Sequence, residues 1–322
     1  MKPDYPEILR EKDYREKIPH ILSRLEEIRK VDYIDTADGG FLYCESYIKE
    51  NADKNVIIVH GCSEFTAKYR EMVWYLLSLN FNVFVYDQRG HGFSHRLVED
   101  TSLIHIDSFD TYVSDLETVI EKLINKNGNK LPLYLFSHSM GGAVSSLYMM
   151  EHPDAVKKAL LCAPMISPQT MKVPRPFVML AIYLNGKRQG WDKRFLHTKD
   201  FNPSVNIKYT VDGSKARFEA AMKLRIATKE YQSSAETNRW MWEAVTVQDK
   251  LLKRKRAEKI NTEVLILSAQ NDTVVKNKCQ FRFAKMLKNG RAVTVPCAKH
   301  NIFFSADNTL WGFYNMLFDF FT

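Results

Sequence analysis

Short apolar runs alternate with longer amphipathic segments along most of this chain. The runs are continuous and rich in β-branched residues, which is typical of strands buried on both faces of a sheet. They lie at residues 55–60, 82–87, 131–136, 156–164, 262–269 and 291–296. Apolar residues recur at helical spacing in the segments 68–79, 109–124, 141–152, 276–289 and 310–321. This alternation predicts an α/β fold with a mostly parallel central sheet flanked by helices and joined by right-handed crossovers.

Three segments depart from the alternation. Residues 1–30 are highly charged and carry a helical pattern towards their end, so we expect an N-terminal helical extension. Residues 31–48 predict two strands around an Asp-Gly-Gly turn. Residues 165–260 are basic and aromatic, and prolines divide them into short helical pieces. We therefore predict a helical cap at 165–260, inserted into a core formed by residues 31–164 and 261–322.

The positive charge of the chain is concentrated in this insertion. The formal net charge is +8, and between Met171 and Ile260 the chain has 20 Lys and Arg against 9 Asp and Glu. Such a segment on a nearly neutral body indicates an anionic partner, either phosphate groups or a membrane surface, or else a solvated lysine-rich face. Because no recognisable nucleic-acid-binding motif accompanies the charge, we expect no nucleic-acid partner.

Cysteine usage and the N-terminus indicate the compartment. The five cysteines are scattered along the chain, which argues against a disulfide framework or a zinc site and for a reducing environment. The first residues are charged and contain no apolar leader. No run approaches the roughly 18 apolar residues that span a bilayer. We expect a cytoplasmic protein, with peripheral contact between the basic cap and an anionic membrane as an open alternative.

The join between a strand and a helix at residues 136–142, FSHSMGG, is the first candidate for chemistry. A sharp strand-to-helix turn strains the backbone of its central residue and presents that side chain above the sheet. This geometry singles out Ser139, with small neighbours required two positions away because strand and helix pass closely. Gly141 meets that demand, and Ser137 stands where the G-x-S-x-G pattern has its first glycine. Ser139 is therefore the predicted nucleophile.

A serine hydroxyl needs a base and a group that orients the base. In a fold with this kind of turn the acid follows the nucleophile along the chain and the histidine comes last. Asp272 lies just beyond a predicted strand, and His300 lies beyond the last one. We predict that both meet Ser139 at the carboxyl edge of the sheet, where open α/β folds place their sites.

Acyl transfer also requires donors for the developing oxyanion. The backbone N–H of Met140, at the start of the helix, is one candidate, and that of Cys62, in the loop HGCSEF, is the other. The cysteine follows the wrong strand to be a nucleophile itself. The remaining candidates for a substrate pocket are His60, Gly61, Glu64 and His138, although His60-Gly61 is equally compatible with an ordinary turn. No H-E-x-x-H spacing suggests a metal site.

Together, HGCSEF, DQRGHGFSHR, SHSMGG, the Asp272 loop and KHN resemble the α/β-hydrolase superfamily. They are most similar to its lysophospholipase and monoacylglycerol lipase-like branch, from about Val31 to the C-terminus. The resemblance implies ester hydrolysis through an acyl-serine intermediate, with Ser139, Asp272 and His300 as the catalytic triad. It also assigns the DQRGHG loop a structural role near the site. Asn301 departs from the pattern, because relatives often have an acidic residue after the histidine.

We therefore expect a serine esterase that acts on a monoacyl lipid, either a lysophospholipid or a monoacylglycerol, without a metal or organic cofactor. The apolar stretch VPRPFVMLAIYL in the cap is too short to span a bilayer, and it would line an acyl pocket or enter a membrane interface. The alternatives on the same scaffold are a carboxylesterase, a thioesterase or an aminopeptidase, since the fold hosts many chemistries. A non-catalytic binding protein is the alternative from another class.

Overall fold

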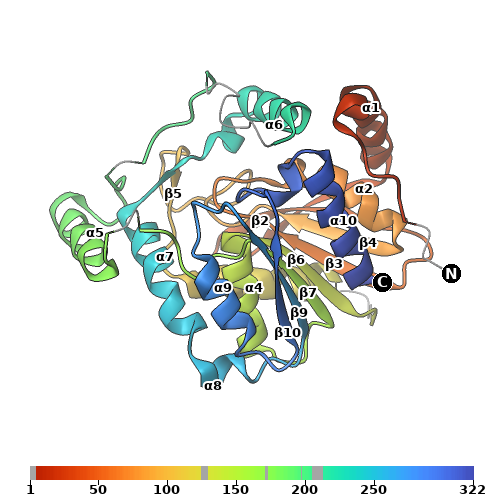
Figure 1. Ribbon diagram of the computed structural model, residues 1–322. Coiled ribbons are helices and arrows are strands. Elements are labelled where there is room, and N and C mark those ends of the chain that lie inside the picture. Colours follow the sequence, from red (N-terminus) through yellow and green to blue (C-terminus); the bar gives the residue numbers. More distant parts are fainter. Residues whose placement is uncertain (1–4, 125–129, 171–172, 197, 205–212) are drawn as a thin grey trace.

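The computed structural model describes residues 5–124, 130–170, 173–196, 198–204 and 213–322 (Figure 1). The strands of its central sheet are β1 (Arg29–Asp35), β2 (Phe41–Tyr47), β3 (Lys54–Val59), β4 (Phe81–Tyr86), β6 (Leu133–His138), β7 (Lys158–Cys162), β9 (Glu263–Ala269) and β10 (Gly290–Val295). These eight strands pair in the order β1-β2-β4-β3-β6-β7-β9-β10. β2 is antiparallel to both of its neighbours, and all other pairs are parallel. The mostly parallel sheet predicted from the sequence is confirmed.

Helices cover both faces of this sheet. The helices that the structure describes, including α5 and α6 that lie further out, are α1 (Glu11–Ile28), α2 (Arg70–Ser78), α3 (Phe109–Val119), α4 (Met140–Glu151), α5 (Arg175–Gln189), α6 (Lys215–Ala227), α7 (Asn238–Leu251), α8 (Arg254–Ala257), α9 (Asn277–Ala284) and α10 (Asp307–Phe321). Shorter helical turns lie at Thr66–Tyr69, Ile120–Ile124, Lys229–Gln232 and Ile302–Phe304. No helix in the described part of the chain is long and apolar enough to cross a membrane.

The continuous apolar runs are explained by the alternation of side chains along each strand. In β3, Ile57 and Val59 pack with α3, α4, α7 and α9 on one face. Val56 and Ile58 point the other way and pack with α1, α2 and α10. Figure 1 shows α4 and α9 on the opposite side of the sheet from α2 and α10. Because successive side chains of a strand point to opposite faces, a two-sided core requires apolar residues at every position.

Between β7 and β9 the chain forms helices α5 to α8, in agreement with the predicted helical pieces. The sequence pattern missed a small parallel sheet formed by β5 (Leu103–Ile104) and β8 (Ala235–Glu236). Strands of two residues carry no periodic signal that a sequence pattern could reveal. The limits of the cap at 165 and 260 remain a prediction.

A buried ion pair connects α6 to the rest of the protein. The fully buried Arg217 of α6 donates to both carboxylate oxygens of Glu71 in α2, at 2.8 and 2.6 Å. It also donates to the Leu9 carbonyl oxygen at 2.8 Å, and Glu11 of α1 accepts from the backbone N–H of Ala216 at 2.7 Å. The N-terminal segment therefore holds α6 against the core, and α1 lies beside α6 in Figure 1.

Candidate active site

Ser139 lies on a sharp turn between the end of β6 and the start of α4. Its backbone has a φ of 49°, which is unusual for a residue with a side chain. The turn is held by hydrogen bonds from the Ser139 N–H to the Cys162 carbonyl oxygen (3.1 Å) and from the Met165 N–H to the Ser139 carbonyl oxygen (2.8 Å). A Cβ on Gly141 would lie only 2.1 Å from the Val59 carbonyl oxygen, so this position requires glycine.

Ser137 occupies the first small position of the turn and is fully buried. Its hydroxyl forms a 2.6 Å hydrogen bond with that of Ser145 in α4. The serine that replaces the usual glycine therefore has a polar partner in the helix that passes over it. This partner satisfies a buried hydroxyl that would otherwise cost free energy.

The structure brings the three predicted catalytic side chains together. The Nε2 atom of His300 lies 2.8 Å from the Ser139 hydroxyl oxygen, and its Nδ1 atom lies 2.8 Å from Oδ2 of Asp272. The other carboxylate oxygen of Asp272 accepts the backbone N–H groups of Val274 (2.8 Å) and Val275 (3.0 Å). The three residues follow the carboxyl ends of β6, β9 and β10, so the parallel sheet gathers them at one edge.

Burial sets the protonation state of the candidate base. Desolvation lowers the pKa of His300, which the hydrogen bond to Asp272 partly offsets. The side chain of Asp272 is fully buried, and that of His300 is 13 % exposed. A neutral imidazole with Nδ1–H directed at a carboxylate leaves Nε2 free to accept the proton of Ser139.

The backbone N–H groups of Met140 and Cys62 are the predicted oxyanion donors. Met140 begins α4, and within the described residues neither its N–H nor that of Cys62 donates a hydrogen bond. The neighbouring Gly61 N–H, in contrast, donates to Oε2 of Glu64 at 2.6 Å. In the loop after β3, Cys62 therefore offers the available donor. The Cys62 thiol lies 3.7 Å from Oε1 of Glu236, and burial raises its pKa well above the ordinary value, so it is not a thiolate.

His60 and Gly61 form the base of that loop. His60 is fully buried: its Nδ1 lies 2.7 Å from the Gly61 carbonyl oxygen, and its Nε2 accepts the Gln88 N–H at 2.9 Å. Burial lowers the pKa of His60 to about 4, so the ring is neutral. A Cβ on Gly61 would approach Oε2 of Glu64 to 2.8 Å. Both residues shape the loop from within, and both ring nitrogens of His60 have partners in the protein backbone.

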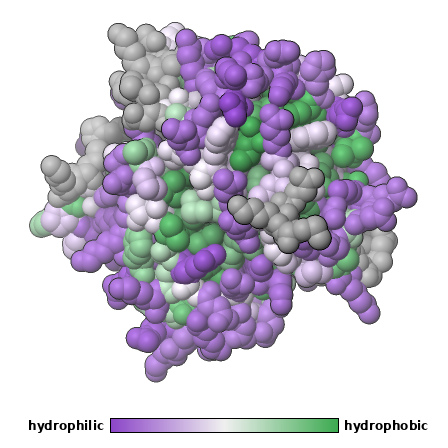
Figure 2. Space-filling model, turned by 45° about the vertical axis from the view of Figure 1, so that its right-hand side comes forward, coloured by the Kyte–Doolittle hydropathy of each residue, from purple (hydrophilic) through white to green (hydrophobic). Residues whose placement is uncertain are grey.

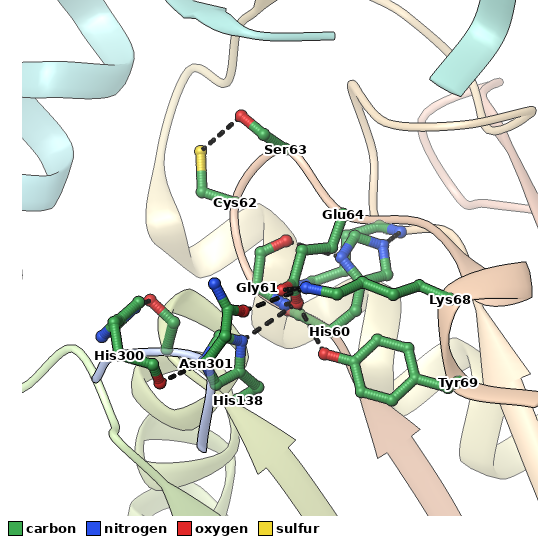
Figure 3. Close-up of polar contacts among 12 residues, drawn as sticks. His60, Gly61, Cys62, Ser63, Glu64, Lys68, Tyr69, His138, His300 and Asn301 are labelled. Atoms are coloured by element: carbon green, nitrogen blue, oxygen red, sulfur yellow. Dashed lines mark hydrogen bonds and ion pairs between the residues drawn. The ribbon is translucent and has the colours of Figure 1, made fainter. Parts of the chain in front are cut away.

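Glu64 is the centre of a buried network beneath the site (Figure 3). Besides Gly61, its carboxylate accepts from the Tyr69 hydroxyl at 2.5 Å and from the Lys68 ammonium, and it lies 3.1 Å from Nδ1 of His138. Burial alone would raise the pKa of Glu64, but the neighbouring His138 and Lys68 charges and hydrogen bonds hold it well below the usual range. Glu64 is therefore an anion whose charge is matched by its neighbours.

This network reaches the loop that carries the candidate base. Nε2 of His138 lies 3.2 Å from the His300 carbonyl oxygen, and Lys68 donates to the Asn301 side chain at 3.0 Å. Sequence reasoning included Glu64 and His138 among the pocket candidates but missed Lys68 and Tyr69. The only available signal was their position, four and five residues after Glu64, where the chain begins a helical turn.

The sequence profile of the family described as "Serine aminopeptidase, S33" matches residues 50–307. Lysophospholipase L2 of Escherichia coli is 27% identical over 271 residues, which span 80% of this chain and 77% of that protein. Monoglyceride lipase of Rattus norvegicus is 32% identical over 147 residues, covering 44% of this chain and 46% of the relative. The profile covers the loop after β3, the serine turn and the two loops with Asp272 and His300.

Solved structures share the fold. A soluble variant of monoglyceride lipase from Saccharomyces cerevisiae, in complex with a substrate analogue, superposes with a TM-score of 0.71 at 19% identity over 91% of this chain and 94% of that one. The monoacylglycerol lipase of Paleococcus ferrophilus gives a TM-score of 0.65 at 20% identity, over 86% and 97% of the two chains. At these identities the likeness establishes the fold of a mostly parallel sheet flanked by helices.

Proposed function

The chain belongs to the serine aminopeptidase, S33 family of hydrolases, and from that premise we propose that it is a serine esterase acting on monoacyl lipids. The substrate would be a lysophospholipid or a monoacylglycerol, cleaved through an acyl-serine intermediate. The observation that carries the proposal is the hydrogen-bonded chain from Ser139 through His300 to Asp272, with both distances at 2.8 Å. The names of the relatives, lysophospholipase and monoglyceride lipase, support the substrate class.

The mechanism follows from the positions of these groups. Nε2 of His300 accepts the hydroxyl proton as the Ser139 oxygen attacks the ester carbonyl carbon. The backbone N–H groups of Met140 and Cys62 stabilise the oxyanion, and Asp272 holds the imidazole tautomer and stabilises the imidazolium. His300 then gives its proton to the departing glycerol oxygen, which leaves the acyl group on Ser139. A water molecule, deprotonated by His300, hydrolyses this ester and restores the free serine.

Covalent labelling tests the assignment of the nucleophile. A fluorophosphonate probe is expected to label the wild-type protein at Ser139 and to leave Ser139→Ala unlabelled. Ser146→Ala is the matched control, because this serine lies in α4, the helix that follows Ser139, and its hydroxyl donates to the Gly142 carbonyl oxygen within that helix. Labelling and ester turnover that persist in Ser139→Ala would refute the mechanism.

The substrate class is tested by rate comparison. Esters, thioesters and peptide amides with a matched acyl group separate an esterase from a thioesterase or an aminopeptidase. We expect the highest kcat/KM for glycerol-linked monoacyl esters. If peptide amides were cleaved fastest, the lipid assignment would fail while the serine mechanism would stand.

We also propose that α5 contacts an anionic membrane surface. Its residues Phe177, Leu180 and Leu184 are 64%, 53% and 56% exposed and lie on one side of the helix, at spacings of three and four residues. Lys187 and Arg188 in its last turn supply positive charge. In Figure 1 α5 lies at the outer edge of the molecule, beyond α7. An exposed apolar stripe beside basic residues is typical of helices that lie in a membrane interface.

A further inference from the structure

A small pocket adjoins the candidate active site under the inserted helices. It has a volume of about 230 Å³ and is lined by Cys62 and Ser63 of the loop after β3, by Asn301, and by Lys68 and Arg225. Cys62 provides the proposed oxyanion donor, and Asn301 directly follows His300 in the chain. The pocket is therefore placed next to the reacting centre, on the side closed by α6.

Among the residues that line this pocket, Arg225 has a guanidinium held by neutral partners. Its Nε donates to the Tyr231 carbonyl oxygen at 2.9 Å and its Nη2 to the Ser233 carbonyl oxygen at 3.0 Å. The guanidinium also lies over the ring of Phe201, 4.5 Å from its centre. Neutral groups thus fix the guanidinium in place, while Nη1 makes no hydrogen bond to any described residue.

The charge of Arg225 has no carboxylate partner within ion-pairing distance among the residues that the structure describes. Partial burial lowers the pKa of this guanidinium, and the negative charge of Glu64 acts in the opposite direction. The Arg225 side chain is half-buried, and cations that are partly withdrawn from water are normally paired. The pocket therefore offers a positioned and uncompensated cation with one free donor group.

Lys68 and Glu64 also face this pocket, and Glu64 would repel an anion. The Glu64 carboxylate, however, already accepts from Lys68, Tyr69, His138 and Gly61. Lys68 and Glu64 balance each other, which leaves the charge of Arg225 in excess. Ser63 and Asn301 add neutral polar groups, and the aromatic side chains of Phe65 and Phe304 form the apolar part of the lining.

We propose that this pocket binds the phosphodiester of a glycerophospholipid headgroup, so that lysophospholipids are preferred to monoacylglycerols. The inference rests on the proposed function and names the substrate class within it. A phosphate oxygen accepting from Nη1 of Arg225 forms a charge-assisted hydrogen bond, about twice as strong as a neutral one. The uncharged glycerol of a monoacylglycerol makes no such bond. Inorganic phosphate shares the chemistry, and the experiment distinguishes the two sources.

The test compares Arg225→Gln with the wild type on a lysophosphatidylglycerol and a monoacylglycerol that carry the same short acyl chain, both below their micelle concentrations. We expect kcat/KM for the lysophospholipid to fall about 10- to 100-fold, the effect of one hydrogen bond to a charged group. The rate on the monoacylglycerol should change less than about threefold. Arg225→Lys should recover part of the loss, and Arg282→Gln, which removes an exposed arginine of α9, should leave both rates unchanged.

Product inhibition provides a second readout that does not depend on the lipid. With a short chromogenic ester as substrate, glycerophosphoglycerol should inhibit the wild type and lose that effect in Arg225→Gln, whereas glycerol should inhibit neither. If inorganic phosphate inhibited as strongly as the diester, the pocket would be a site for free phosphate and the headgroup assignment would be wrong.

The outcomes separate the two proposals. An equal loss of rate on both lipids would assign Arg225 a structural role. The same conclusion would follow if urea titration showed that neither Arg225→Gln nor Arg225→Lys is folded. Either result would overturn this inference and leave the proposed function standing. A wild-type protein that hydrolyses neither lipid would instead overturn the proposed function. Retained preference for the lysophospholipid in a folded Arg225→Gln would refute the pocket assignment directly.

Discussion

The imidazole of His138 supports the loop of His300 from below: its Nε2 lies 3.2 Å from the His300 carbonyl oxygen. Its Nδ1 lies 3.1 Å from the Glu64 carboxylate. Both ring nitrogens face oxygen acceptors, so both hydrogen bonds form together only when the ring carries two protons. The residue next to the proposed nucleophile thus connects the loop after β3 with the loop that holds the proposed base.

Replacing His138 by Gln should therefore affect the base without touching the substrate. After burial, repulsion from the His138 ring is among the causes that lower the pKa of His300, so removing that ring should raise the pKa of His300. The acid limb of the kcat/KM profile is expected to move to higher pH, with a fall in kcat of about tenfold from poorer positioning. His20→Gln in α1 is the exposed control. An unmoved acid limb in His138→Gln would contradict the coupling.

Glu64→Gln tests the centre of the same network. The change keeps the shape of the side chain but leaves the Lys68 ammonium without its buried counter-ion and the His138 ring without a carboxylate acceptor. We expect a loss of about 3 kcal/mol in the free energy of unfolding, the usual cost of breaking a buried ion pair on one side. Urea titration measures this loss. In kinetic assays kcat should fall, while KM should change less. A variant as stable as the wild type would argue against the network.

The strained backbone of Ser139 predicts a difference between two inactive variants. Alanine keeps the Cβ atom that is unfavourable at a φ of 49°, whereas glycine has no Cβ atom. Ser139→Gly should therefore be more stable than Ser139→Ala, with a free energy of unfolding about 1 kcal/mol higher. Both should lose roughly 10⁴-fold or more in kcat. Equal midpoints in urea would show that the turn stores no strain at this residue.

Acid should destabilise the protein through His60. Its folded-state pKa of about 4 lies below the ordinary value of 6.5, so the unfolded chain binds the proton more readily. The contribution of the neutral His60 ring to the free energy of unfolding is fully present above pH 6.5. It is lost as the pH falls from 6.5 towards 4, by up to about 3 kcal/mol. Urea midpoints measured from pH 7 to 4 test this dependence, and His60→Gln should flatten it. A slope of the opposite sign would exclude a buried neutral imidazole.

Membrane contact through α5 is tested by vesicle sedimentation. Phe177→Ser with Leu180→Ser should weaken binding to phosphatidylglycerol vesicles about tenfold or more, since each buried apolar side chain contributes about 1.5–3 kcal/mol. Ile28→Ser replaces another exposed apolar residue, 43% exposed at the end of α1, and should bind as the wild type does. Binding that is unchanged in the double variant, or independent of vesicle charge, would contradict the proposal.

Much of the architecture could be predicted because it depends on local pattern. Continuous apolar runs such as residues 55–60 indicated strands buried on both faces, and they are strands of the central sheet. Helix ends were less predictable: the helical pattern at 276–289 ends as a helix at Ala284. The two-residue strands of β5 and β8 went unpredicted because they pair across more than a hundred residues of chain and have no period of their own.

By itself, the sequence determined which side chains follow the carboxyl ends of which strands, and therefore that Ser139, Asp272 and His300 would meet at one edge. Only the tertiary structure decided which charged side chains find partners of opposite charge. Glu64 is matched by Lys68 and His138, while Arg225 is left with neutral carbonyls, and neither fact has a signature in sequence spacing. The physical reason is that hydrophobic periodicity is a property of one segment, whereas the energy of a buried charge depends on groups that distant segments bring within a few ångströms.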